Sequence, residues 1–134
     1  IELGTDNYEK AEDCYRTAQL LFTIDQYSKA KNYANQAISL DENYGPPYIL
    51  IAQMYANNNK WSEEPAMNKC TYFLAIDKLQ RAKNVDPNVA EDANKLIRTY
   101  SAYTPKPEDL FFLGIKKGDK VNIGGWIGET TTVR

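Results

Sequence analysis

The chain has 134 residues, of which 43% are apolar and 25% are charged, a composition typical of one globular domain. Its 16 basic and 18 acidic residues nearly cancel, which excludes a nucleic-acid binder or an anionic-membrane binder that works by charge alone. The absence of histidine excludes Ser-His-Asp and Cys-His catalysis and His-ligated metals. No apolar run approaches the ~20 residues of a membrane span. We therefore predict no enzyme, no cofactor, no metal site and no membrane insertion by this segment.

The sequence shows neither a signal-peptide pattern nor a disulfide pattern. Because the chain begins at Ile1, we expect a fragment or a processed product. Cys14 and Cys70 are too few for a disulfide framework and lie in apolar, helix-like surroundings. We predict buried or part-buried free thiols, with a disulfide or a reactive role as the alternative.

Helical periodicity dominates the chain up to Tyr103, and five helices are predicted in chain order. Asp6 and Glu9 have the spacing of a capping box at the start of the first helix. Ser62 is expected to cap a long fourth helix over about 63–84, and Asp86 caps the fifth. The packing stripes of the first, second, third and fifth helices are Ala11, Cys14, Ala18 and Leu21; Ala30, Ala34 and Ala37; Tyr48, Ile51, Ala52 and Tyr55; and Val89, Ala93, Leu96, Ile97 and Tyr100.

The segment after Thr104 has a different character. Leu110–Ile115 is apolar, Val121–Ile123 alternates and Thr130–Val133 is rich in β-prone residues, so two or three short strands are predicted. Its apolar content favours packing on the last helices, although Phe111, Phe112 and Trp126 would also serve self-association if exposed. Lys116, Lys117 and Lys120 are interpreted as a charged hairpin turn.

An internal repeat links the helices. The pair Ala18-Gln19 recurs as Ala52-Gln53 at an offset of 34, and the stretches around Tyr27–Asp41 and Tyr72–Asp86 match at an offset of 45. The larger second offset indicates an insertion around Trp61–Cys70 in the second repeat.

These features resemble the tetratricopeptide repeat, a helix-turn-helix unit of about 34 residues. The small-to-bulky pair in the first helix matches Ala18 with Leu21 and Ala52 with Tyr55, and the unit closes with Asp86-Pro87. The resemblance implies a mainly α superhelix of antiparallel helix pairs over residues 1–104, followed by an extension with short strands over 105–134. The implied parts are repeat one at about 11–44, repeat two at about 45–89 and a capping helix at about 87–103.

The first residues and the tail extend this resemblance. Ile1–Gly4 looks like the end of a preceding repeat's second helix, and the tail is similar to C-terminal extensions of tetratricopeptide-repeat proteins of the Bacteroides group. The resemblance therefore implies the C-terminal part of a longer bacterial repeat protein, with the periplasm favoured over the cytoplasm. The departures are Cys14 at a usually bulky position, Asp41-Glu42 in place of Asp-Pro, and the insertion.

The candidate site follows from the repeat geometry. In the family, one helix of every repeat faces a concave groove that binds peptides. The side chains that the resemblance places there are Tyr15, Gln19, Phe22, Ile49, Gln53, Asn57, Asn94 and Arg98. The predicted function is a non-catalytic scaffold that binds an unidentified peptide or protein segment. The alternative is a self-association domain whose groove is covered by its own tail or by a neighbouring chain.

Overall fold

The computed structural model describes residues 3–134, and their side chains from residue 7 onward. Helices take up 65% of the chain and a two-stranded antiparallel sheet lies near the C-terminus, which confirms the predicted mainly α class with a short β tail. The elements are α1 (Leu3–Thr23), α2 (Tyr27–Leu40), α3 (Pro46–Asn57), α4 (Pro65–Lys69), α5 (Thr71–Val85), the 3₁₀ turn η1 (Pro87–Val89), α6 (Ala90–Ser101), α7 (Pro107–Phe111), β1 (Lys120–Ile123) and β2 (Glu129–Thr132).

The first two helices form an antiparallel pair with alanines at their contact. Ala11 and Ala18 on α1 and Ala30, Ala34 and Ala37 on α2 are fully buried, and their small side chains allow the two backbones to approach closely. The predicted capping box is wrong, because α1 has already begun at Leu3 and includes Asp6. Leu3 and Gly4 belong to this same helix rather than to a preceding one, and Ile1 and Glu2 lie outside the described residues.

The third helix forms the centre of the core and is linked to the segment that follows α5. Gly45, just before α3, donates its amide hydrogen to Oδ2 of Asp86 at 2.9 Å. A Cβ atom at Gly45 would lie 2.6 Å from Val89, so glycine is required for this close approach. Asp86 also accepts from the amide of Asn88, as expected for an N-cap.

The predicted fourth helix is interrupted at Cys70, so the expectation of one helix over about 63–84 is wrong. Asn68 holds the loop before α4, because its Oδ1 accepts from the amides of Trp61 and Ser62 at 3.1 and 2.8 Å. Its Nδ2 donates to the carbonyl of Ser62 at 2.8 Å. Glu64, not Ser62, is the N-cap of α4. These bonds hold the loop of the insertion against α4, which ends at Lys69, and α5 begins at Thr71.

The tail contains one helical turn and a hairpin. Val121 pairs with Thr131 in the β1–β2 ladder, so the two strands predicted after Lys120 are confirmed. Leu110–Ile115 forms no strand, because the helical turn α7 begins at Pro107 and includes Leu110. Side chains of the tail share one hydrophobic cluster with α3, namely Leu110, Val121, Ile123, Ile127 and Val133.

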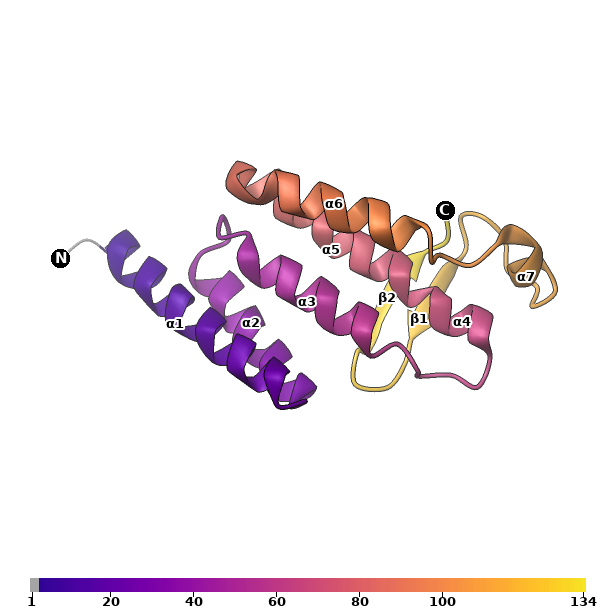
Figure 1. Cartoon of the computed structure of the whole chain (residues 1–134), viewed down its shortest axis with the longest axis horizontal. Coiled ribbons are helices and arrows are strands. Elements are labelled where there is room, and N and C mark those ends of the chain that lie inside the picture. Colours follow the sequence, from indigo (N-terminus) through magenta and orange to yellow (C-terminus); the bar gives the residue numbers. More distant parts are fainter. Residues whose placement is uncertain (1–2) are drawn as a thin grey trace.

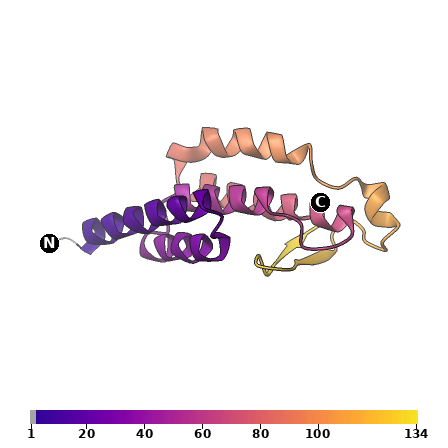
Figure 2. The same ribbon diagram turned by 60° about the horizontal axis from the view of Figure 1, so that its bottom comes forward.

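The helices form two sides of an elongated molecule. Figure 1 looks onto α1, α3 and α6, whereas α2, α5 and the hairpin lie behind them. Figure 2 shows the hairpin on the same side as α2, away from α1 and α6. The tail therefore packs on α5 and reaches α2 and α3, so the prediction that it packs on the last helices holds for α5. Within residues 3–134, no helix combines the length and the apolar character needed to cross a bilayer.

Candidate functional site

A concavity of about 440 Å³ opens on the side of the molecule formed by α1, α3 and α6. We call it the α1–α3–α6 groove. Each of the three helices contributes side chains to its walls. They include Tyr15 from α1, Ile49 and Gln53 from α3, and Asp92, Lys95 and Leu96 from α6.

Tyr15 is held in place by two neighbours. Its ring packs edge-on against Tyr44, with 5.7 Å between the ring centroids. Its hydroxyl oxygen accepts a hydrogen bond from Nε2 of Gln19 at 3.2 Å. Burial raises the pKa of the Tyr15 phenol, so this group is a neutral hydroxyl at physiological pH. The groove therefore presents a fixed aromatic face with a hydroxyl that can still donate.

Ile49 and Gln53 lie one turn apart on α3. Ile51, Ala52 and Tyr55 occupy the fully buried side of the same helix. Helical geometry then directs positions 49 and 53 to the side facing α1 and α6, because residues four apart share a face. The repeat offset that relates Tyr15 to Ile49 in the sequence thus corresponds to two side chains that line one groove.

The last long helix presents a different face from the predicted one. Asn94 lies against α5, where its Oδ1 accepts from Nζ of Lys83 at 2.9 Å. Arg98 is one turn further along this side and is exposed. Asn94 and Arg98 therefore do not line the groove, because burial of Ala93 against α5 turns them away from α1. Asp92 and Lys95 take their place.

Three further predicted residues also lie outside the groove wall. Phe22 is partly buried against the core and Tyr27, with 5.8 Å between the ring centroids, because it lies in the last turn of α1, next to the start of α2. Asn57 is exposed at the last position of α3. Gln19 is exposed and reaches the groove only through Tyr15. The groove thus unites Tyr15, Ile49 and Gln53 from the predicted set.

Sequence reasoning missed Asp92, Lys95 and Leu96 as groove residues. Leu96 belongs to the predicted packing stripe of its helix, and it contacts the second hydrophobic cluster while also lining the groove. Asp92 and Lys95 are exposed charges three positions apart, which sequence alone does not separate from an ordinary solvated face. Together they give the groove one negative and one positive group beside an apolar floor.

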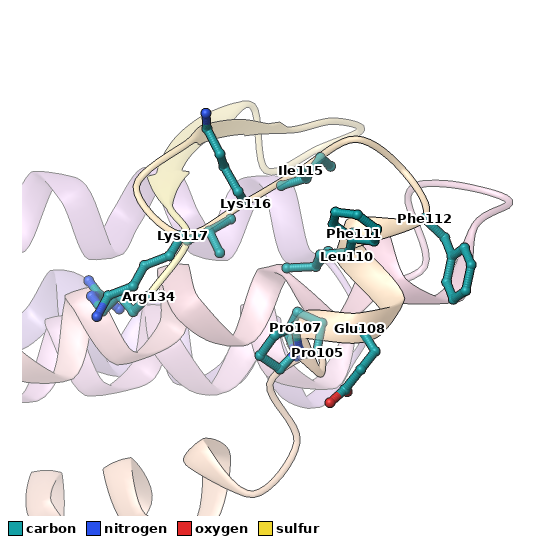
Figure 3. Close-up of a pocket in the computed structure, with 11 residues that line it drawn as sticks. Pro105, Pro107, Glu108, Leu110, Phe111, Phe112, Ile115, Lys116, Lys117 and Arg134 are labelled. Atoms are coloured by element: carbon teal, nitrogen blue, oxygen red, sulfur yellow. The ribbon is translucent and has the colours of Figure 1, made fainter.

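A second, larger concavity of about 690 Å³ lies between α7 and the end of β2 (Figure 3). We call it the α7 groove. Its walls are mostly apolar and come from Pro105, Leu110, Phe111, Ile115 and Val133. The sequence signal for it is the run of apolar residues after Pro107. It lies at one end of the long axis of the molecule, away from the α1–α3–α6 groove.

Among the described residues, a cluster of charged side chains is centred on Glu129. Lys78 Nζ donates to Oε1 of Glu129 at 2.8 Å, Lys31 Nζ lies 3.8 Å from Oε2, and the Tyr55 hydroxyl donates to Oε2. Lys31 also donates to the carbonyl of Ile127 at 2.5 Å. These groups come from α2, α3, α5 and the tail. The cluster therefore connects the tail to three helices.

The charges in this cluster are satisfied by one another. Burial raises the pKa of the Glu129 carboxyl, but the hydrogen bonds from Lys78 and Tyr55 and the charges of Lys78 and Lys31 outweigh it, so the pKa lies below its ordinary value. Burial and the bond to Glu129 raise the pKa of Tyr55, and burial lowers the pKa of Lys31. The charged groups of the cluster thus pair with one another, and their contacts join the tail to α2, α3 and α5.

The cysteines are both free, as predicted. Cys14 is partly exposed, whereas Cys70 is fully buried and burial raises the pKa of its thiol to about 11. Among the side chains that the structure describes, from residue 7 onward, no three His, Cys, Asp or Glu are arranged to hold a metal ion.

No family model, curated protein or solved structure matches this chain. The resemblance to the tetratricopeptide repeat therefore rests on the sequence pattern alone.

Proposed function

We propose that the chain is a non-catalytic, tetratricopeptide-repeat-like scaffold that binds a peptide or protein segment in the α1–α3–α6 groove. One observation carries the proposal. Tyr15 and Ile49, which are equivalent positions of the two repeats, line the same open concavity, and Gln53 lies beside them. Repeat proteins commonly use such a surface, made of one helix from each unit, for binding.

The side chains of the groove define the chemistry of a ligand. Ile49 and Leu96 offer an apolar floor, while Tyr15 and Gln53 offer a hydroxyl and an amide. This combination suits an extended or helical segment with apolar anchors, whose backbone amides are satisfied by the polar groups. With one positive and one negative side chain at the groove, binding is expected to depend only weakly on salt.

The position of the tail bears on the alternative in which the chain covers its own groove. The hairpin lies with α2 and α5, on the opposite side from the α1–α3–α6 groove. Gly124 and Gly125 in its connecting loop lie against Trp61 of the insertion, and Trp126 stacks on Tyr27. The groove is therefore open in this structure, which supports an external ligand over the chain's own tail.

Peptide display tests the proposal. A library of random short peptides is selected on the wild-type chain, and the enriched sequences are titrated by calorimetry. We expect them to bind the wild type and to lose binding to Ile49→Arg, which fills the groove with a charged side chain. Ile24→Arg is the matched control, because Ile24 is exposed beyond the end of α1 and outside the groove.

Two results would contradict the proposal. One is the absence of any enriched peptide. The other is equal affinity of the enriched peptides for the wild type and for Ile49→Arg. A thermal melt of Ile49→Arg by circular dichroism checks that the variant is folded, and Gln53→Ala provides a milder change at the same groove.

A further inference from the structure

The most exposed large apolar side chains of the described chain lie at α7. Phe112 is 86% exposed and Phe111 is 76% exposed, whereas the neighbouring Leu110 is buried at 2%. Exposing two adjacent phenylalanines is unfavourable unless another surface covers them. Figure 3 shows the two rings directed to different sides of α7. The helix therefore carries aromatic side chains that the fold itself does not use.

The same face also contains an apolar groove that can accommodate an aromatic side chain. The α7 groove has apolar walls formed by Pro105, Leu110, Ile115 and Val133, and its volume of about 690 Å³ admits a phenyl ring. Phe111 and Phe112 both belong to the residues that line this groove (Figure 3). One patch therefore holds both projecting apolar anchors and an apolar hollow.

The charges around the α7 groove have both signs, on opposite rims. Glu108 lies on the α7 side, and Lys116 and Lys117 lie on the side of the loop that precedes β1 (Figure 3). None of these three takes part in an ion pair among the residues that the structure describes. Arg134, which also lines the groove, is already paired with Asp77.

We propose that this face binds a second copy of the chain, in a two-fold symmetric dimer built on α7. When the two-fold axis runs along the groove, parallel to its rims, the acidic rim of one copy lies opposite the basic rim of the other. Glu108 of one copy then faces Lys117 of the other, and the contact occurs twice. The patch contains projecting aromatic rings, an apolar groove and rims of opposite charge. It is therefore complementary to a second copy of itself, as an isologous interface requires.

The exposed rings supply a large part of the area that such a dimer needs. Exposures of 76% and 86% leave roughly 240–400 Å² of the two rings uncovered, taking about 150–250 Å² for each aromatic side chain. Two copies that each bury both rings remove about 500–800 Å² from the rings alone. Specific interfaces bury about 1,200–2,000 Å², so the surfaces around the rings must contribute the rest.

The mixed charges also argue against other partners. An anionic membrane or a nucleic acid favours a patch of one sign, whereas here Glu108 and Asp109 precede the exposed rings and Lys116 and Lys117 follow them. The self-association proposal is independent of peptide binding, because the two grooves share no residue.

Sedimentation velocity over a range of concentrations tests the dimer. We expect a reversible dimer for the wild type and for Leu20→Asp, a control at a side chain that is 68% exposed on α1. Phe112→Asp should raise the dissociation constant about tenfold or more, since removing a central aromatic anchor weakens an interface strongly. Phe112 is exposed in the single chain, so this substitution should leave the fold intact.

A charge exchange makes the test specific for the proposed geometry. Glu108→Lys and Lys117→Glu should each weaken the dimer, because each places like charges opposite one another twice. Mixed in equal amounts, the two variants should form a heterodimer, because a lysine then faces a glutamate at both contacts between the copies. A monomeric wild type, a dimer unaffected by Phe112→Asp, or a mixture no tighter than its components would overturn the proposal. Binding of a monomeric wild type to anionic vesicles through Phe112 would also overturn it.

Discussion

Replacing Glu129 by alanine removes the acceptor shared by Lys31, Lys78 and Tyr55. It leaves two ammonium groups close together without their counter-ion and one buried hydroxyl without its acceptor. The side chains of Lys31, Lys78 and Glu129 are only 19%, 26% and 30% exposed, so water replaces the lost contacts incompletely. The cost should therefore exceed that of an ordinary surface ion pair.

The magnitude lies between two known limits. Breaking a buried ion pair by removing one partner costs about 3–5 kcal/mol, and an exposed pair is worth less than about 1 kcal/mol. The partial exposure of Glu129 places Glu129→Ala between these limits, at about 2–3 kcal/mol. For a chain of this length the melting temperature should fall by about 6–15 °C. Glu129→Gln, which can still accept from Tyr55, should lose less.

The pH dependence follows from the lowered pKa of Glu129. The ordinary value is 4.5, and the folded pKa lies below it, so the unfolded chain takes up the proton first as the pH falls. The stability that the charge provides is fully present above about pH 5 and is lost as the pH falls through the folded pKa. The difference between wild type and Glu129→Gln should therefore shrink below pH 4.5.

Thermal and urea unfolding, followed by circular dichroism, measure these differences. Glu63→Ala is the control, because Glu63 is exposed in the insertion and should change the stability by less than about 0.5 kcal/mol. If Glu129→Ala and Glu63→Ala unfold at the same temperature, the cluster does not hold the tail, and the reasoning is refuted.

Three other outcomes are expected. Ala52→Leu overpacks a fully buried position of α3 and should lower the free energy of unfolding in urea by about 1–3 kcal/mol. Gln80→Leu, on the exposed side of α5, should leave it nearly unchanged. Equal urea midpoints for the two variants would contradict the close packing at Ala52. A thiol reagent at about pH 8 should label Cys14 readily and Cys70 only on unfolding. Equal labelling rates for the two cysteines would show that Cys70 is accessible in the folded chain. An acidic C-terminal peptide should show no calorimetric binding, because the groove lacks a multi-cation clamp. Salt-sensitive binding that is lost in Lys95→Ala, the cation that lines the groove, would show otherwise.

Local patterns predicted the helices and part of the groove. The spacing of alanines marked the contact of α1 with α2, and the repeat offset selected Tyr15 and Ile49. Both signals are local, because similarly spaced positions on a helix share one face. Asn94 and Arg98 lie outside the groove because the rotation of α6 about its axis follows from its packing on α5, which the sequence does not give.

Features that depend on distant residues were not predictable in the same way. The helix breaks at Cys70 although the apolar pattern runs through it without glycine or proline, and the bonds by which Asn68 holds Trp61 and Ser62 have no local sequence signal. The partnership of Glu129 with Lys31 joins residues from opposite ends of the sequence, and no periodicity indicates it. The turn α7 did have a local signal, since Pro107 is followed by two acidic residues, as at many helix starts.

The bond from Lys31 to the carbonyl of Ile127 has a consequence for how the molecule comes apart. In a simple array of repeats each unit contacts only its neighbours, so the ends fray and the middle persists. Here the last residues are fastened to the second helix, and the chain is closed upon itself. Unfolding of either end then disrupts the other, so amides of α2 and of β2 should exchange with solvent hydrogen in a single cooperative opening. A contact between residues so far apart in the sequence also slows folding, because the long segment between them must close into a loop before the contact forms.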